Sequence, residues 1–216
     1  MHRTAIAEEQ SEFALQILRD QINQRVYPIH RLDRPTSGVL LFAKQKSVLK
    51  DTMALFQQKT VKKEYLAVVR GFTPPQQTID HPIKKDITKQ NADPKPAITN
   101  YTTLDTIELL IPVGRYQTAR YSLVKITPET GRMHQIRRHF KHINHHVLRD
   151  KTYGDWRHNK MILDQFGWKT MFLHASKLSF NHPITGTEIN VVAPINEVWQ
   201  SMLKTFNWKL AIDSPS

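Results

Sequence analysis

The grouping of strand-like segments constrains the fold of this chain more than any other feature. Residues 99–111 and 119–126 follow one another with no helical pattern between them, and residues 171–180 and 188–193 do the same. Strands that come in consecutive runs, rather than singly between helices, favour a largely antiparallel sheet. We therefore expect an α+β fold with a mainly antiparallel central sheet flanked by helices.

Shorter patterns fill the rest of the chain. They predict a helix over 8–24, a buried strand over 38–43, a helix capped by Ser47, a strand over 63–70 ended by Gly71, and a last helix capped by Asn196 that reaches Phe206. Five of the 12 prolines lie in the polar stretch 74–96, which we expect to be an irregular excursion over the surface. No second domain has to begin there, so we expect residues 1–216 to form one domain.

The charge of the chain favours a polyanionic partner. Its 31 Lys and Arg against 19 Asp and Glu give a formal net charge of +12, which attracts nucleic acid first and an anionic membrane surface second. No window approaches the roughly 18 apolar residues of a membrane-spanning helix, and the N-terminus lacks the apolar core of a signal peptide. We therefore expect a cytoplasmic protein that binds nucleic acid and no membrane.

The sequence lacks the residues that several kinds of catalytic site require. Having no cysteine, the chain has no disulfide, thiol nucleophile, iron–sulfur cluster or cysteine zinc site. His142 and His146 have the i, i+4 spacing of a zinc site, but no zincin glutamate accompanies them. The carboxylates are too scattered for a two-metal nuclease, and neither glycine-rich phosphate-binding pattern occurs. We therefore expect neither a metal nor a cofactor.

Residues 30–38, HRLDRPTSG, form the first candidate site, a polar turn just before an apolar run. Loops held by a rigid strand commonly carry catalytic groups. The turn also has a purely structural interpretation, in which Asp33 accepts hydrogen bonds from backbone amides and both arginines face water. Spacing alone favours that simpler interpretation.

Residues 130–140, TGRMHQIRRHF, form the second candidate site. On a helical wheel Met133, Ile136 and Phe140 make an apolar stripe, and Arg137 lies at its edge. A guanidinium at the edge of a buried face needs an anionic partner, whereas the other basic residues can reach phosphates. A basic helix that is simply solvated is the alternative.

Taken together, these stretches and several others resemble the RluA-type pseudouridine synthases. The resemblance follows the family's order over most of the chain and rests on HRLD at 30–33, TSG at 36–38, KEYLAVVRG at 63–71, residues 130–138, DKTYGD at 150–155, LHA at 173–175 and HPITG at 182–186. Residues 113–121 and 154–159 look most similar to the members that act on uridine 65 of tRNA. The family's N-terminal strand and Asn-Lys-Pro turn are missing, and Arg149-Asp150 stands where Gly-Asp is typical.

The resemblance implies a catalytic cleft in which uridine of tRNA, at position 65, is flipped out of its helix and isomerised to pseudouridine without a cofactor. Asp33 is the implied nucleophile, as carboxylates are in retaining glycosidases, with attack at C1′, attack at C6 and a glycal route all open. Arg137 would pair with Asp33 and keep it charged, and Tyr65 would stack on the base and offer its hydroxyl for proton transfer at C5.

Further residues would surround the substrate. Ile136 would form an apolar wall of the pocket, and Arg31 would fill the space that the flipped nucleotide leaves. The expected phosphate contacts are Lys44, Lys62, Lys63, Arg132, His134 and Arg138. We expect a monomer whose partner is tRNA. Two alternatives stay open, an RluA-like synthase for ribosomal RNA and a non-catalytic RNA-binding protein.

Overall fold

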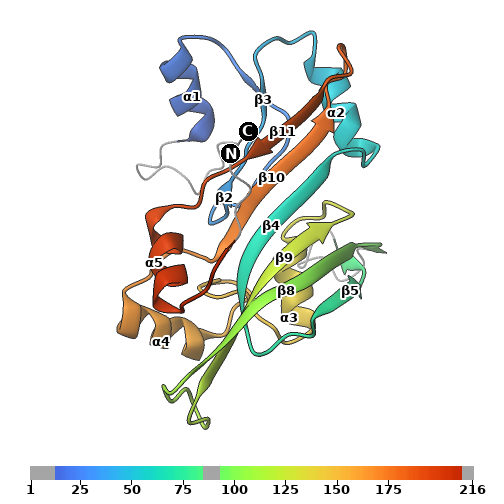
Figure 1. The fold of residues 1–216 in the computed structure, drawn as a ribbon. Helices are drawn as coiled ribbons and strands as arrows, with labels where there is room; N and C mark the ends of the chain where they lie inside the picture. The colour runs from blue at the N-terminus through green and yellow to red at the C-terminus, as the bar shows by residue number, and fades with distance from the viewer. Residues whose placement is uncertain (1–12, 85–92, 211–216) are drawn as a thin grey trace.

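A seven-stranded sheet lies at the centre of the computed structural model, which describes residues 13–84 and 93–210 (Figure 1). Its strands are β2 (Ser37–Gly38), β4 (Lys62–Arg70), β5 (Gln76–Asp80), β8 (Ile98–Leu109), β9 (Ala119–Pro128), β10 (Leu173–Asn181) and β11 (Glu188–Val192). Their order is β11-β10-β4-β9-β8-β5, antiparallel at every step, and β2 pairs with β10 in parallel. The expected α+β fold is confirmed.

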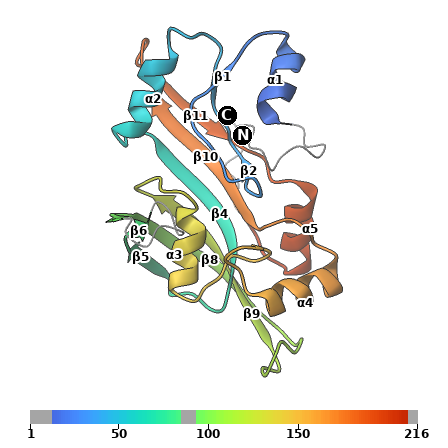
Figure 2. The same cartoon turned by 180° about the vertical axis from the view of Figure 1, so that it is seen from behind.

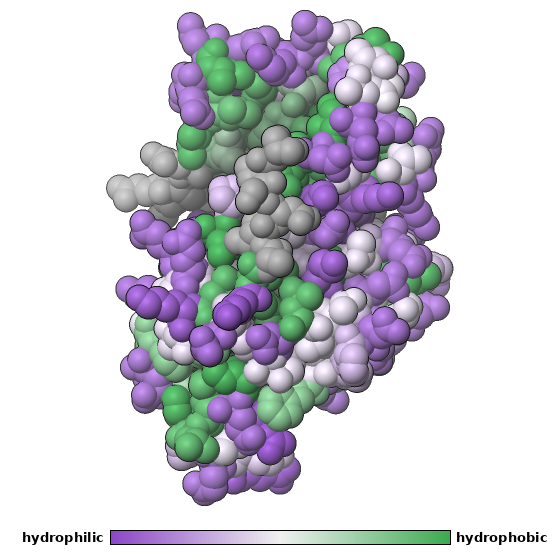
Figure 3. All heavy atoms as spheres, viewed as in Figure 1, coloured by the Kyte–Doolittle hydropathy of each residue, from purple (hydrophilic) through white to green (hydrophobic). Residues whose placement is uncertain are grey.

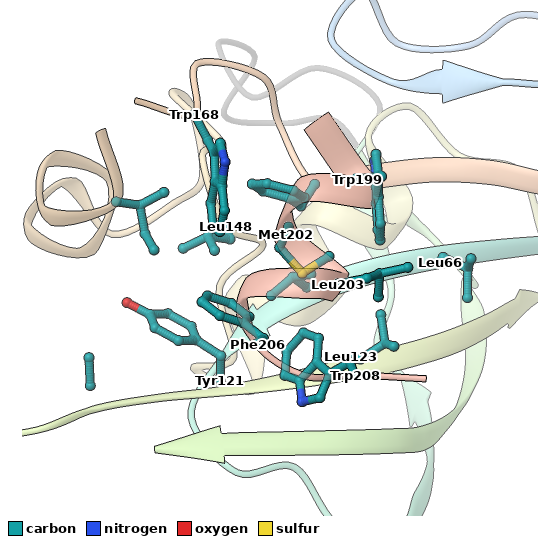
Figure 4. Close-up of a cluster of buried hydrophobic side chains, with 14 of the residues drawn as sticks. Leu66, Tyr121, Leu123, Leu148, Trp168, Trp199, Met202, Leu203, Phe206 and Trp208 are labelled. Atoms are coloured by element: carbon teal, nitrogen blue, oxygen red, sulfur yellow. The ribbon is translucent and has the colours of Figure 1, made fainter. Parts of the chain in front are cut away.

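Helices cover both faces of this sheet. They are α1 (Ala14–Ile22), α2 (Leu49–Gln57), α3 (Gln135–His142), α4 (Trp156–Phe166) and α5 (Glu197–Thr205). Because successive side chains of a strand point to opposite faces, Leu66 and Val68 of β4 pack with residues of α4 and α5 (Figure 4). Ala67 and Val69 pack on the other face with residues of α3, which Figure 2 shows in front of the sheet. In the described part of the chain, no helix combines the length and apolar character needed to cross a membrane.

The sequence predicts most of these elements correctly. The strands over 63–70, 99–111, 119–126, 171–180 and 188–193 are confirmed to within a few residues. The last helix is confirmed as well, and the Asn196 side chain caps it by accepting a hydrogen bond from the Trp199 backbone. The helix over 8–24 is confirmed from Ala14 to Ile22, and residues 8–12 lie outside the described residues.

Two predictions are wrong, and a third needs correction. The run 38–43 is not one buried strand, because the chain turns at Gly38 and the run divides between β2 and β3 (Phe42–Ala43), which pairs with β1 (Tyr27–Pro28). The stretch 74–96 is not irregular throughout, because Pro74, Pro75 and Pro82 flank β5 rather than interrupt it, and β6 (Ile83–Lys84) pairs with β7 (Pro94–Lys95), which begins with a proline. The helix after Ser47 exists, but Val48 occupies its N-cap position without a side-chain bond.

The parallel pairing of β2 with β10 fixes the polar loop that precedes β2. The Ser37 hydroxyl lies 2.8 Å from Nδ1 of His174, and the Val39 backbone donates to the Ala175 carbonyl at 2.9 Å. Gly38 has φ +111°, and a Cβ there would collide with the Ala175 carbonyl oxygen. Only glycine fits this close approach, so the TSG and LHA motifs form one joint that holds the loop to the sheet.

We predict that Gly38→Ala lowers the free energy of unfolding by at least about 2 kcal/mol, because both the left-handed backbone and the contact with Ala175 must give way. Gly186→Ala is the matched control. Gly186 also has a positive φ, +70°, but a Cβ there would meet no atom within 4 Å, so only the backbone strain of about 1 kcal/mol applies. Urea denaturation measures both, and equal losses for the two variants would contradict the prediction.

Candidate active site

A cleft of about 710 Å³ lies between α2, the start of β4, the start of α3 and the loop before β2. It is lined by the three residues that the sequence predicts to be catalytic, Asp33, Tyr65 and Arg137. Five of the predicted substrate contacts line it as well: Arg31, Ile136, Lys63, Arg132 and His134. Segments that are far apart in the sequence therefore meet at one concave site, as binding sites require.

Not every predicted contact reaches this cleft. Lys44, Lys62 and Arg138 are not among its lining residues, and Arg138 donates to the Lys84 carbonyl at 2.8 Å. The predicted apolar stripe of the basic helix also needs correction, because Met133 precedes α3 and is exposed, whereas Ile136 and Phe140 are buried.

The predicted pairing of Asp33 with Arg137 is present. Nη1 of Arg137 lies 3.1 Å from Oδ2 of Asp33, and only 4% of the Arg137 side chain is exposed against 24% for Asp33. Arg137 is therefore buried outright rather than placed at the edge of a buried face. The structural alternative for the loop holds only in part: Arg31 and Arg34 are exposed, but the Thr36 amide bonds to the Asp33 backbone carbonyl and not to its carboxylate.

A second carboxylate, which the sequence reasoning does not assign to the site, holds Arg137 more firmly. Asp150 accepts hydrogen bonds from Nε and Nη2 of Arg137 at 2.7 and 2.8 Å, and its side chain is fully buried. Burial alone would raise the pKa of Asp150, but hydrogen bonds from Arg137, Tyr153 and Thr152 hold it below the usual value. Burial lowers the pKa of Arg137, but its hydrogen bonds with Asp150 and Asp33 and the charges of these two residues raise it above the usual value. One cation thus joins two anions.

The backbone around Asp150 explains the departure from Gly-Asp in the sequence. Arg149 has φ +63°, a left-handed conformation that favours glycine, and its side chain compensates by donating to the Asn159 carbonyl at 2.6 Å. The Asn159 side chain accepts a hydrogen bond from the Arg149 amide and donates one to the Asp150 carbonyl. The loop therefore keeps its shape with arginine at this position. The motif DKTYGD is the only sequence signal for Asp150.

The start of β8 positions α3, and with it Arg137. The Gln135 side chain at the first turn donates to the Ile98 carbonyl and to the Thr99 hydroxyl, both at 2.9 Å. Its oxygen accepts from the Thr130 hydroxyl at 2.7 Å. All of these groups are at least partly buried, so the bonds are made away from competing water. The start of the basic helix is therefore clamped to the sheet and is not a freely solvated face.

His134 and Tyr153 cover the charged trio. The Arg137 guanidinium lies over the Tyr153 ring, 5.0 Å from its centroid, and the Tyr153 hydroxyl lies 3.0 Å from Nδ1 of His134. Nε2 of His134 is 3.8 Å from the free oxygen of Asp33. Burial lowers the pKa of His134, and the charge of Asp33 offsets this only in part, so the ring is neutral at pH 7. His134, which the sequence predicts to contact phosphate, therefore lies next to Asp33.

Tyr65 lines the cleft from β4, on the same sheet face as Ala67 and Val69. Burial and the negative charge of Asp33 raise the pKa of Tyr65 to about 12. Its hydroxyl is therefore protonated at neutral pH. A neutral phenol ring can stack on a base, and its hydroxyl can relay a proton only by giving up its own as it accepts another.

His30 ties the Asp33 loop to α2. Its Nε2 accepts a hydrogen bond from the Leu41 backbone at 3.1 Å, and its ring stacks on Phe56 with centroids 4.9 Å apart. Burial lowers the pKa of His30 from 6.5 to about 4, so the ring is neutral where it holds the loop. By contrast, His142 and His146, whose spacing resembles a zinc site, have separate contacts: His142 stacks on His81 and His146 bonds to the Tyr153 carbonyl.

Comparison with known proteins identifies the family of the chain. Residues 1–142 match the family model described as RNA pseudouridylate synthase. A protein of Haemophilus influenzae called tRNA pseudouridine synthase C is 45% identical over 97% of this chain and 90% of its own length. The chain belongs to the RNA pseudouridylate synthase family. The resemblance to the RluA-type synthases is thereby confirmed.

Other relatives and a solved structure agree with the assignment of the chain to this family. Proteins of the same name from Pasteurella multocida and Yersinia pestis are 42% and 41% identical over 97% and 96% of the chain, and over 89% and 84% of their own lengths. The solved structure of human RNA pseudouridylate synthase domain containing 1 has a TM-score of 0.69 and 25% identity, and covers 93% of this chain and 86% of its own. The synthase therefore has the fold of that family.

We predict that protonation of His30 destabilises the synthase in mild acid. The unfolded chain binds this proton near pH 6.5 and the folded chain only near pH 4, so the stability is present above pH 6.5 and is lost as the pH falls toward 4. His30→Gln keeps an acceptor for the Leu41 amide but does not titrate. Its unfolding free energy should therefore fall less between pH 7.5 and 5, by on the order of 1 kcal/mol. A pH dependence identical to that of the wild type would contradict the prediction.

A second prediction concerns Asp150. Asp150→Asn removes the buried charge that orients Arg137, so pseudouridine formation should fall at least tenfold in kcat, and stability should fall by up to about 3 kcal/mol. The control is the same substitution in an exposed ion pair, Asp164→Asn beside Lys160. It should leave kcat unchanged and alter the free energy of unfolding by no more than about 0.5 kcal/mol. An Asp150→Asn variant with normal kcat would contradict the prediction that Asp150 orients Arg137 for the reaction.

Proposed function

We propose that this synthase converts uridine to pseudouridine in tRNA, with Asp33 as the nucleophile. The relatives carry tRNA in their names, and the observation that carries the proposal is the carboxylate of Asp33 beside a buried guanidinium in the cleft. The reaction breaks the N1–C1′ bond and forms a C5–C1′ bond, while a proton leaves C5 and N1 gains one. Substrate and product contain the same atoms, so a carboxylate that bonds covalently and leaves again suits this rearrangement.

The charged trio suits Asp33 to this role. A buried carboxylate with a dedicated cation of its own would be held by both of its oxygens, whereas Arg137 already gives two donors to Asp150. Among the described residues, the Asp33 carboxylate receives one hydrogen bond, at Oδ2. Nε2 of His134 lies 3.8 Å from Oδ1, beyond hydrogen-bond distance. Arg137 therefore orients and stabilises the anion while Oδ1 stays available to attack.

The remaining cleft residues would hold the flipped nucleotide. The Tyr65 ring and Ile136 offer apolar surface to the base, and stacking on an aromatic ring contributes on the order of 1–3 kcal/mol. Arg31, Lys63 and Arg132 would contact the sugar–phosphate backbone at the rim, and Arg31 would also enter the vacated space in the helix. Lys44, Lys62 and Arg138, which do not line the cleft, would contact RNA outside it.

Finer points belong to the same proposal. Residues 113–121 and 154–159 are most similar to the family members that act on uridine 65 of tRNA, which supports uridine 65 as the target. A tRNA substrate also fits a cytoplasmic enzyme. We treat the described sheet and its helices as one catalytic domain, because residues of its two faces share strand β4.

The decisive experiment measures tritium release from tRNA transcripts that carry tritium at uracil C5. The wild type should release tritium, and Asp33→Ala should lower the rate by at least about a thousandfold, because Glu129, the other carboxylate that lines the cleft, is bound by Asn100 and is not paired with Arg137. Arg137→Met should abolish turnover as well and leave RNA binding largely intact. Mapping the modified position then tests uridine 65. A folded wild type that releases no tritium from any tRNA would favour a non-catalytic RNA-binding protein.

A further inference from the structure

Three arginine–aromatic stacks lie at the surface, far from the cleft. The guanidinium carbon of Arg115 is 5.1 Å from the Tyr116 ring centroid, that of Arg157 is 5.1 Å from Trp156, and that of Arg120 is 5.2 Å from Phe72. The aromatic residues are widely exposed, at 53% for Tyr116, 66% for Trp156 and 45% for Phe72. Aromatic side chains normally bury most of their surface, so three exposed rings with arginine on each require an explanation.

The structure brings these stacks to one end of the molecule. A Cβ on Gly114 would lie 3.3 Å from Cδ of Arg157, so the end of the β8–β9 hairpin touches the start of α4. The Gly71 amide donates to the Arg120 carbonyl at 2.7 Å, which places Phe72 beside the same hairpin. In Figures 1 and 2, α4 and the hairpin end lie at the lower end of the molecule and α2 at the upper end. We call this group the distal surface: Phe72, Arg115, Tyr116, Arg120, Trp156 and Arg157.

The distal surface is separate from the active site. Strand β4 runs from Lys63, which lines the cleft, to Arg70, which pairs with Asp155 just before α4. Seven residue steps of a strand span about 23 Å, at about 3.3 Å each. A nucleotide bound in the cleft therefore cannot also contact the distal surface, but a more distant part of the same RNA can.

The charge of this end favours an anionic partner. Four arginines lie there, and only two carboxylates pair with them, Glu108 with Arg120 and Asp155 with Arg70. Arg115 and Arg157 form no ion pair with any described residue. Figure 3 shows hydrophilic and hydrophobic residues interspersed over this lower end, rather than one apolar patch. A guanidinium binds phosphate with two parallel hydrogen bonds, and both it and an aromatic ring can stack on an unpaired base.

The stacks are already ordered in the free protein. Arg115 donates a hydrogen bond to the Tyr116 hydroxyl at 2.9 Å, and this bond, with the charges of Arg115 and Arg70, lowers the pKa of Tyr116. An arginine that rests on a ring has less freedom to lose when it binds a phosphate, so the binding free energy is larger. Protein partners also use tyrosine, tryptophan and arginine, but the surplus of arginine over carboxylate here matches a polyanion.

We propose that the distal surface is a second RNA-binding site, which contacts the sugar–phosphate backbone and exposed bases of the tRNA away from the target uridine. This inference rests on the proposed function for the identity of the RNA. The distal surface would thereby let the synthase distinguish a whole tRNA from a short stem that only carries the same uridine.

Two double variants test the proposal. Arg115→Ala with Arg157→Ala removes charge, and Tyr116→Ala with Trp156→Ala removes the rings. The matched control, Arg19→Ala with Lys204→Ala, removes two exposed positive charges elsewhere. Filter binding measures Kd for a full-length tRNA transcript and for a hairpin cut from it that is too short to reach both sites. Because all the substituted side chains are exposed and lie outside the hydrophobic core, urea denaturation should give midpoints near that of the wild type.

The expected result is a Kd for full-length tRNA that rises at least about tenfold in each test variant, with the hairpin and the control within about twofold of the wild type. The salt dependence of log Kd should also lose a slope of about 1 to 2 in the arginine variant. Unchanged binding, an equal loss on the hairpin, or no tRNA binding by the wild type would overturn the proposal. If the wild type makes no pseudouridine but shows the expected losses, the distal site stands and the proposed function fails.

Discussion

The position of one buried cation, Arg137 between Asp33 and Asp150, is the constraint on which the site depends. An unpaired guanidinium in this place would be costly, and a single carboxylate would satisfy only part of its five donors. With Asp150 behind it and Asp33 in front, Arg137 is nearly inaccessible yet fully charged. The trio carries one more negative than positive charge, and the excess lies on the carboxylate that faces the cleft.

The rest of the architecture serves to bring these groups together. Strand β10 holds the Asp33 loop through His174 and Ala175, β4 carries Tyr65, and the start of β8 clamps the start of α3 through Gln135. A twisted sheet of seven strands is stiff, so groups attached to three neighbouring parts of it keep their distances. Such fixed distances are what a nucleophile and its orienting cation require.

The sequence predicts those parts that depend on local pattern. Alternation in β4 and the long strand runs predict their strands correctly. The need of a half-buried arginine for an anion predicts a partner for Arg137, and the resemblance to the family identifies that partner as Asp33. Asp150 could not be found in this way, because its burial results from the long-range packing of an irregular loop. Helix α4 is also missed, although Asp155 and Gly167 mark its ends, because the residues that it buries include the polar His158 and Asn159. At Gly38 the sequence predicts a strand that does not exist as one piece. The apolar run 38–43 gives no sign of the contact between Gly38 and Ala175 that divides it.

The joint between β2 and β10 has a consequence for the biosynthesis of the enzyme. Ser37 and His174 are 137 residues apart, so the loop that carries Asp33 cannot bind to the sheet until β10 has been synthesised. Contacts of such separation close late and slowly in folding. A nascent chain that ends before β10 would carry a complete Asp33 motif and still have no assembled pocket. Assembly of the pocket therefore has to wait for the synthesis of β10.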